Sequence, residues 1–439
     1  MRRPALLLVG AAVAVSALSL LIPWSLAFDP QAWVVWGRDA LDLALDTRSG
    51  PSWKPLPVLF TTPFALAGDA APALWMIVAR TGGLLALAGA AVLATRLAGR
   101  TAGVVAAAVM ALSPWWFYNT ILGNSEGLLV AAVLWAVVAH LAGRERAALA
   151  LLGAAALLRP EVWPFLGLYG LWLWRRDPAA RREAAAIAMT VPLLWLGPDV
   201  AGIGGALTAS EGARGEASPG SAALEDVPGL AVLADAVTLL TVPAALAAVA
   251  GALAGPRVAR PLAAAALVWV AIVAVMAQAG FAGNQRYLVV AVALACVLAG
   301  VGAAAYAPRL VSAVLVIAVA LVTVGDLREQ GDEVKVRVDR RAALPELVAA
   351  AGGRDALVRC SRVRTAADVR PLVAWELDLP LLALDAAPRP PAVVIRWQPH
   401  YPGSIEPIQE PAQAGFRPLA QAPGWDVWVS CGPAAQTTG

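Results

Sequence analysis

The sequence predicts an α-helical polytopic membrane protein with a small soluble α/β domain at its C-terminal end. Of the 439 residues, 60% are hydrophobic and only 14% are charged, and the mean hydropathy is +0.70. Apolar runs close to the roughly 20 residues that a membrane-spanning helix needs recur along the first three quarters of the chain. The formal net charge of +3 is small and spread over short loops, which argues against a nucleic-acid-binding surface.

About eleven membrane segments are expected between residues 1 and 325, which we take as the membrane domain. One long apolar run, 147–174, is interrupted at its middle by Arg159, Pro160 and Glu161, so it is expected to form two short helices in a hairpin. The other nine segments are expected to be single spans, at Ala5–Ala27, Ala71–Thr95, Ala102–Tyr118, Ser125–Leu141, Ala184–Gly202, Gly229–Ala254, Leu262–Gly280, Tyr287–Tyr306 and Leu310–Gly325.

The positions of the basic residues support this count, because arginine and lysine concentrate in short cytoplasmic loops. When 147–174 is counted as a hairpin, all the short loops that carry arginines lie on one side of the membrane. The segments 28–70, 197–228 and 281–286 then lie on the other side. The alanine, glycine and arginine content is typical of a GC-rich bacterium. We therefore expect a multi-pass protein of a bacterial inner (plasma) membrane, with a cytoplasmic N-terminus and an extracytoplasmic C-terminal domain.

The tail, residues 326–439, is much more polar and is expected to form that soluble domain. Apolar runs predict strands at Ala356–Cys360, Ala392–Trp397 and Trp425–Cys431, and a helix at Ala342–Ala351.

Cysteine and histidine usage is sparse. Cys360 and Cys431 lie at the ends of predicted strands, and in an oxidising compartment they are expected to form a disulfide. Cys296 lies inside a span and is interpreted as a small buried apolar residue. No metal site is expected, because His140 and His400 fall on opposite sides of the membrane in this topology.

Ionisable residues near the membrane are the first candidates for function. Arg80 and Arg159 interrupt long apolar runs, where a charge costs about 3 kcal/mol or more and therefore usually faces a cavity, a partner or a substrate. The carboxylates of Asp29 and Glu126 stand just outside neighbouring spans. Alternatively, Arg80 could pair with an acidic neighbour inside the bundle. Glu126 could be an exposed residue at the start of a helix.

The stretch 78–137 reads VARTGGLLALAGAAVLATRLAGRTAGVVAAAVMALSPWWFYNTILGNSEGLLVAAVLWAV. It resembles the shared segment of the GT-C membrane glycosyltransferases, which use polyprenyl-phosphate sugars and include bacterial mannosyl-, arabinosyl- and aminoarabinose transferases. In that class an arginine opens the second span, a short basic loop follows, and an acidic residue lies after the third span. Arg80, Arg96 and Glu126 match this order.

Four further motifs are similar to elements of the same class. They are FDPQAW with Asp29, PSWKPLP with Lys54, LLRPEVWPF with Arg159, and GNQRYL, in which Arg286 and Tyr287 open a late span. The resemblance implies transfer of a sugar from a polyprenyl-phosphate donor to a glycan, lipid or protein acceptor of the cell envelope, in contact with the bilayer. Nothing in the sequence requires a cofactor, and nothing in it supports the binding of a divalent cation.

The resemblance also implies roles for individual residues. A phosphate leaving group needs no protonation, so the site needs a general base for the acceptor and positive charge for the phosphate. Asp29 is expected to be the base, with Glu126 as a second catalytic carboxylate. The phosphate-binding candidates are Lys54, Arg80, Arg159 and Arg286, and the candidates for stacking on a sugar are Trp33, Trp36 and Trp53.

Several alternatives remain open at this stage. Many members of the class carry two adjacent acidic residues in the first loop, whereas Pro30 follows Asp29 here. Asp39, Asp42 and Asp46 therefore compete for the base role, although their spacing also suits the solvated face of an interfacial helix. Arg286 could instead anchor its helix at the membrane interface. Glu161 could be a salt-bridge partner of Arg159.

Two other functional classes compete with a transferase: a membrane transporter or lipid-linked-glycan flippase, and a non-catalytic scaffold for envelope assembly. Transporters often contain two matched broken helices. The sequence indicates one broken segment, 147–174, and no partner for it in the second half, which favours the transferase.

Overall fold

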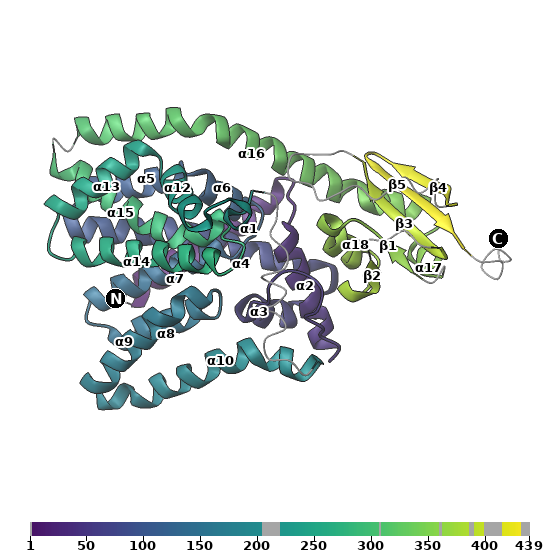
Figure 1. Ribbon diagram of the computed structural model, residues 1–439, viewed down its shortest axis with the longest axis horizontal. Helices are drawn as coiled ribbons and strands as arrows, with labels where there is room; N and C mark the ends of the chain where they lie inside the picture. Colours follow the sequence, from purple (N-terminus) through teal and green to yellow (C-terminus); the bar gives the residue numbers. More distant parts are fainter. Residues whose placement is uncertain are drawn as a thin grey trace. The chain divides into compact units, whose positions relative to one another are not determined.

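The computed structural model describes residues 2–203, 220–306, 309–359, 362–385, 390–398 and 415–431. These residues form two compact units (Figure 1). The helical unit comprises Met1–Ile22, Lys54–Pro57 and Met76–Gly331, and the mixed unit comprises Pro23–Trp53, Val58–Trp75 and Asp332–Gly439.

The helical unit is built from apolar helices packed around a buried central one, α15 (Val289–Ala305). A side chain at Gly300 would run into the backbone of Ala102 on α5, and one at Gly302 into that of Ala247 on α13. Small residues thus let backbones approach closely, as in membrane helix packing. The other helices of the unit are α1 (Arg2–Leu18), α4 (Ala71–Ala98, from Met76 on), α5 (Arg100–Ala111), α6 (Pro114–Ile121), α7 (Glu126–Leu141), α8 (Glu145–Ala156), α9 (Trp163–Arg176), α10 (Arg181–Ile203), α12 (Pro228–Leu240), α13 (Val242–Ala254), α14 (Ala259–Gln278) and the first part of α16 (Leu310–Ala350).

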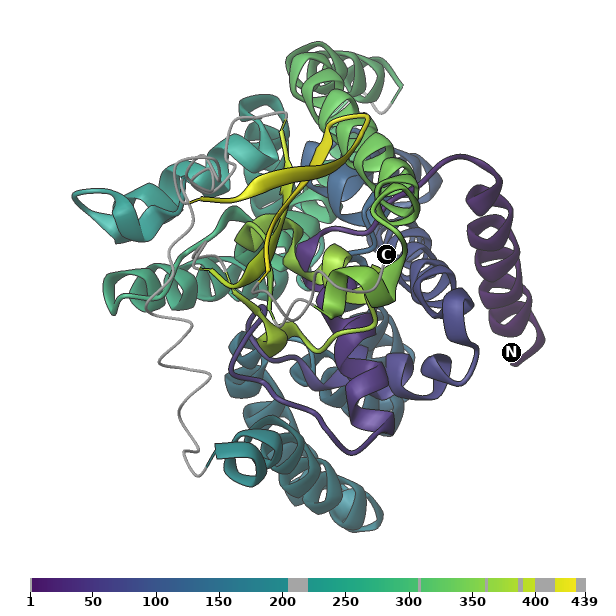
Figure 2. The ribbon, with the colours of Figure 1, turned by 90° about the vertical axis from the view of Figure 1, so that its right-hand side faces the viewer.

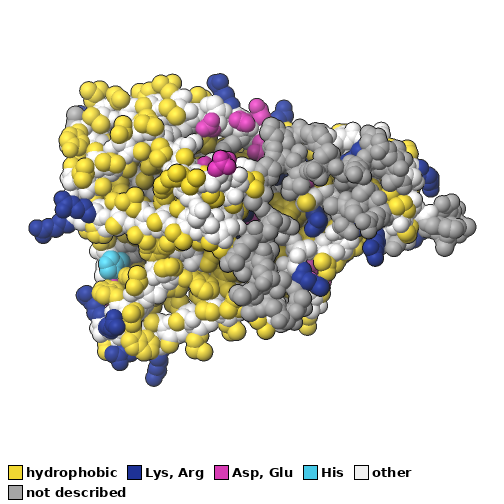
Figure 3. Space-filling model, in the orientation of Figure 1, with side chains coloured by type: hydrophobic (Ala, Val, Ile, Leu, Met, Phe, Trp, Pro, Cys, Tyr) yellow, Lys and Arg dark blue, Asp and Glu magenta, His cyan; other side chains and the backbone are white. Residues whose placement is uncertain are grey.

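Within the described residues, five helices are long and apolar enough to cross a membrane, or up to seven if two bent pairs count as one span each. Hydrophobic side chains cover much of the face of the helical unit in Figure 3. The protein is therefore a multi-pass membrane protein, although the expected number of eleven segments is not confirmed. Several expected spans are shorter than the requirement, such as α7 with 16 residues.

The hairpin expected at 147–174 is present. α8 ends at Ala156, a single 3-10 turn at Pro160–Val162 follows, and α9 begins at Trp163.

Two spans that were expected to be continuous are broken. Residues 102–118 divide between α5 and α6 with a bend of 66°, and residues 229–254 divide between α12 and α13 with a bend of 93°. Each second helix carries a proline in its first turn, Pro114 in α6 and Pro243 in α13. Proline cannot continue a helix but suits the first turn of a new one, which explains both breaks. The second half of the chain thus contains a broken helix that the sequence interpretation missed.

The mixed unit contains a five-stranded sheet in the order β2-β1-β3-β5-β4, whose last two strands, β4 and β5, are yellow in Figure 1 and Figure 2. β1 pairs in parallel with β2 and β3, and β5 pairs antiparallel with β3 and β4. The strands are β1 (Val363–Arg364), β2 (Leu384–Asp385), β3 (Ala392–Trp397), β4 (Arg417–Ala422) and β5 (Trp425–Ser430), and the helices are α2 (Phe28–Leu41), α3 (Pro55–Ala65, from Val58 on), α17 (Arg354–Val358), α18 (Arg370–Glu376) and the last part of α16.

The strands expected at 392–397 and 425–431 match β3 and β5. The strand expected at 356–360 is wrong, because residues 354–358 form α17. Gly353, with φ +88°, starts this helix in a conformation that other residues rarely adopt, and it follows a second positive-φ glycine, Gly352. Cys360 lies outside the described residues, so its disulfide with Cys431 remains a prediction.

α16 is one continuous helix of 41 residues, and it includes both the span expected at 310–325 and the helix expected at 342–351. The boundary expected at residue 326 therefore lies inside a helix. The two compact units divide α16 after Gly331, and the mixed unit also includes Pro23–Trp53 and Val58–Trp75, which contain most of the first predicted outer segment.

Candidate functional site

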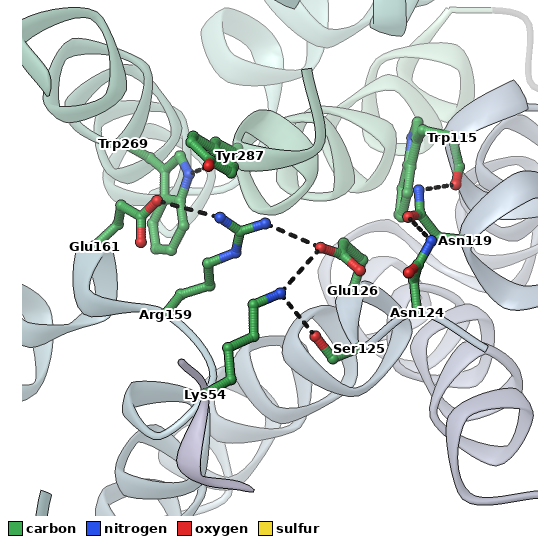
Figure 4. A network of polar contacts seen from close by, with 10 residues as sticks. All are labelled: Lys54, Trp115, Asn119, Asn124, Ser125, Glu126, Arg159, Glu161, Trp269 and Tyr287. Atoms are coloured by element: carbon green, nitrogen blue, oxygen red, sulfur yellow. Dashed lines mark hydrogen bonds and ion pairs between the residues drawn. The ribbon is translucent and has the colours of Figure 1, made fainter. Parts of the chain in front are cut away.

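A buried ion-pair cluster in the helical unit is centred on Glu126, the first residue of α7, which is 1% exposed. Arg159 Nη2 donates a hydrogen bond of 2.9 Å to Glu126 Oε1, and Lys54 Nζ lies 3.7 Å from the same oxygen (Figure 4). All three side chains are more than 90% buried. Because such charges are costly to bury, they are stable here only as partners of one another.

Arg159 reaches this cluster from the break between α8 and α9. Its backbone is extended, with φ −148° and ψ 129°, because a residue before proline avoids the helical region. Its guanidinium lies 4.1 Å from the centre of the Tyr287 ring, a cation–π contact. Trp269 Nε1 in turn donates to the Tyr287 carbonyl at 2.7 Å. The break in the hairpin is therefore what places an arginine inside the bundle.

Lys54 enters the cluster from the residues just before α3. The backbone nitrogen of Leu56 donates to the Leu157 carbonyl at 3.2 Å, which joins this segment to the end of α8. Lys54 Nζ also donates to Ser125 Oγ at 3.3 Å. Both interactions lie within the helical unit, so the predicted Lys54 and Arg159 are brought to one carboxylate although they are more than 100 residues apart.

The cluster holds more positive than negative charge. Glu161 Oε1 lies 3.7 Å from Arg159 Nη1, as the salt-bridge interpretation expected, and Arg286 lies 6.0 Å from the centre of the Tyr287 ring, which Arg159 also contacts. Three cations and two carboxylates leave a net charge of about +1. Among the described residues, the second carboxylate oxygens of Glu126 and Glu161 accept no hydrogen bond although they are buried. The net positive charge suits the cluster to bind one further anionic group, whereas the two carboxylate oxygens can accept hydrogen bonds from a hydroxyl group.

Arg80 is not part of this network. Its guanidinium donates to the Ser19 carbonyl at 3.1 Å, to Ser19 Oγ at 2.7 Å and to the Ile121 carbonyl at 3.1 Å. Within the described chain, its hydrogen bonds thus go to oxygens at the ends of two helical segments, and none goes to a carboxylate. These contacts indicate that Arg80 joins helices, and the structure lends no support to its expected phosphate role.

Asp29 and the three tryptophans of the first loop belong to the mixed unit, so their expected approach to the Glu126 cluster stays a prediction. Asp29 lies in the first turn of α2 and is 7% exposed. Trp33 packs edge-on against Trp75 with 5.5 Å between ring centres, and Trp36 lies 5.6 Å from Trp53. Trp33 and Trp36 are fully buried, which favours a packing role over stacking on a sugar.

The three other aspartates of this loop do not share one solvated helix face. Asp39 is buried within α2 and pairs with Arg38 at 3.2 Å, whereas Asp42 caps the end of the helix and Asp46 lies beyond it. Burial raises the pKa of Asp39 to about 6 despite the opposing charge of Arg38. Its titration near neutral pH keeps Asp39 in competition with Asp29 for the base role.

Several residues of the site carried no signal in the sequence. Ser125, Trp269 and the buried amides of Asn119 and Asn124, which are joined by a 3.1 Å hydrogen bond, lie near the cluster in Figure 4. Asn124 stands two residues before Glu126 in the chain. In the described residues, no group of three or more histidine, cysteine or acidic side chains is arranged to hold a metal ion.

The fold described above is shared with a solved membrane protein. The chain is similar over 99% of its length to the crystal structure of ArnT from Cupriavidus metallidurans bound to undecaprenyl phosphate, with 14% identity, a TM-score of 0.59 and coverage of 99% of that chain. The apo structure of the same protein matches with 13% identity, a TM-score of 0.45, and coverage of 97% of this chain and 98% of that one. No family model and no curated protein matches. At this identity, the similarity establishes the fold.

Proposed function

We propose that the protein is an integral-membrane glycosyltransferase that moves a sugar from a polyprenyl-phosphate donor to a glycan, lipid or protein acceptor of the bacterial cell envelope, on the extracytoplasmic face. The observation that carries this proposal is the buried Lys54–Glu126–Arg159 cluster, with its excess of positive charge. It is supported by the fold, which is similar to that of a protein solved with undecaprenyl phosphate.

In this proposal the cluster binds the donor phosphate. Arginine suits this role because its planar fork can bind two phosphate oxygens at once. Arg159 and Arg286 bind the phosphate, Lys54 adds charge, and Glu126 holds Arg159 and Lys54 in position. As the glycosidic bond to phosphate breaks, the negative charge that grows on the leaving oxygen is stabilised by these cations.

The acceptor hydroxyl must lose its proton as it attacks the anomeric carbon. We assign this base role to Asp29, in the first turn of α2, with Asp39 as the next candidate. The phosphate needs no acid, so one carboxylate is sufficient for the proton transfer.

The proposal is tested by measuring two properties of the purified protein in nanodiscs. Binding is followed with undecaprenyl phosphate as the probe, and transfer is followed by incorporation of label from radiolabelled lipid-linked sugars extracted from bacterial membranes. Arg159→Gln should weaken binding and lower transfer, whereas Arg100→Gln, an exposed control in the same unit, should change neither. Absence of undecaprenyl phosphate binding by the unmodified protein would refute the proposal.

A second candidate, a flippase for lipid-linked glycans, is favoured by one observation. The 93° break between α12 and α13 gives the second half a broken helix to match the α8–α9 hairpin, which removes the argument against a transporter. Proteoliposomes separate the two functions, since a flippase moves a labelled lipid across the bilayer without forming a new glycosidic bond.

A further inference from the structure

A second ligand site in the helical unit is indicated by an apolar cavity of about 680 Å³. It is lined by side chains of α7, α8, α9, α14 and α15, and its volume lies within the roughly 300–1,000 Å³ of ligand-binding pockets. Lys54, Glu126, Arg159 and Arg286 do not line it. The cavity is thus separate from the proposed phosphate cluster, although Val162, in the 3-10 turn after Arg159, forms part of its wall.

The cavity has the depth of one leaflet. Its lining runs from Val258, directly before α14, to Trp269, eleven positions further on, which is about 17 Å at 1.5 Å per residue. Half of a hydrocarbon core of about 30 Å has nearly the same length. An acyl chain that enters at one membrane surface can therefore extend along the whole cavity.

The ionisable side chains of the lining stand at the end remote from the cluster. Arg257, just before α14, is the one lining cation among the described residues, and His140 and Tyr169 stand at the same end, with His140 Nδ1 3.1 Å from Tyr169 Oη. Arg176 lies 5.2 Å from the ring centre of Trp172, another lining residue.

The charges at this end are not all available to a ligand. Arg176 is 3.7 Å from Glu145, and Arg146 is paired with Glu183. Arg257 has no ion pair among those found in the described residues and is exposed at the mouth of the cavity. An apolar slot of one leaflet's depth with a cation at its mouth matches a lipid with an anionic headgroup, a recognised pattern for basic pockets between membrane helices.

We propose that this cavity binds an anionic phospholipid, with one acyl chain between α7, α9 and α14 and its phosphate at Arg257. The donor lipid is the less suitable occupant, because with its phosphate at the Arg159 cluster only its tail would enter the cavity, and Arg257 at the mouth would meet no anionic group. Val162, which directly follows Glu161, and Phe165, in the first turn of α9, line the cavity. The bound chain therefore also packs against the hairpin that carries Arg159 and holds it in place.

The test compares lipid binding by the delipidated full-length protein in detergent, measured by native mass spectrometry and by thermal stability. Phosphatidylglycerol should bind and raise the melting temperature more than phosphatidylcholine does. Arg257→Gln should weaken phosphatidylglycerol binding about five-fold, the effect of one basic residue near a lipid phosphate. Arg260→Gln, an exposed control three residues away on α14, should leave it unchanged.

A second variant guards against a folding defect. Ala265→Phe fills the cavity and leaves Arg257 in place, so it should reduce phosphatidylglycerol binding while adding to the apolar packing. The proposal would be overturned if the two phospholipids bound equally, or if Arg257→Gln and Arg260→Gln weakened phosphatidylglycerol binding equally. Displacement of phosphatidylglycerol by undecaprenyl phosphate would also overturn it. These measurements do not depend on sugar transfer, so their failure is distinguishable from failure of the proposed glycosyltransferase activity.

Discussion

The pairing of Arg159 with Glu126 offers the sharpest test of the site. Replacing Arg159 by Gln removes the 2.9 Å charged hydrogen bond but leaves Lys54 at 3.7 Å from Glu126 Oε1. At an effective dielectric constant of about 20, the remaining pair still contributes about 4 kcal/mol of Coulomb energy. Glu126 is therefore not left as an isolated buried charge, and the cost in stability should fall near the lower end of the ~3–5 kcal/mol typical of a broken buried pair.

Replacing Glu126 by Gln should cost at least as much stability, because it leaves Arg159 and Lys54 buried with only Glu161 to offset them. The double variant Arg159→Gln/Glu126→Gln removes both charges, so its loss should be smaller than the sum of the single losses by about 1–3 kcal/mol. Melting temperatures of the four proteins in nanodiscs provide this comparison. Additive losses would mean that the two side chains are not coupled and would refute the cluster as described.

Donor binding is the second readout of the same cycle. Hydrogen bonds to charged groups contribute about 1.5–3 kcal/mol, so Arg159→Gln should weaken undecaprenyl phosphate binding by roughly 10- to 150-fold. Arg100→Gln is the matched surface control. Unchanged affinity in Arg159→Gln, with a folded protein, would remove this arginine from the phosphate site.

Three further predictions concern the mixed unit. Asp29→Asn should lower sugar transfer about 10²- to 10⁴-fold with little effect on undecaprenyl phosphate binding, and near-normal turnover would direct attention to Asp39. Because burial raises the pKa of Asp39 from 3.8 to about 6, the folded protein retains a proton there that the unfolded chain loses, so this group's contribution to stability falls as the pH rises from about 4 to 6. The melting temperature of Asp39→Asn, measured against pH, should lack this part of the pH dependence. A profile identical to that of the unmodified protein would mean that Asp39 does not titrate in this range. Mass spectrometry of protein kept without reductant should find Cys360 and Cys431 joined, and two free thiols would argue against an extracytoplasmic tail.

Hydrophobic composition and proline placement were sufficient to predict much of the architecture. The membrane class follows from a composition that cannot be buried in a water-soluble domain of this size, and the α8–α9 hairpin from Arg159-Pro160, since proline prevents a helix from continuing. The strands at 392–397 and 425–430 follow from short apolar runs rich in valine and tryptophan.

The errors arose where local sequence did not decide the outcome. Apolar runs at 102–118 and 229–254 are long enough for one span, and their prolines fix a break but not its angle, which depends on what each half packs against. α16 continues through the polarity change at 326, because helical hydrogen bonds are indifferent to whether the side chains face lipid or water.

The sequence by itself determined which residues were candidates for the site, because an ionisable side chain in an apolar run is too costly to be there without a partner. Only the tertiary structure decided which partner each one has. Arg80 and Arg159 look alike in the sequence, yet Arg80 bonds carbonyl and hydroxyl oxygens at helix ends, whereas Arg159 meets the carboxylate of Glu126 beside Lys54. The physical reason is that an ion pair requires a distance of a few ångströms, and distances between residues far apart in the chain are set by how the helices pack.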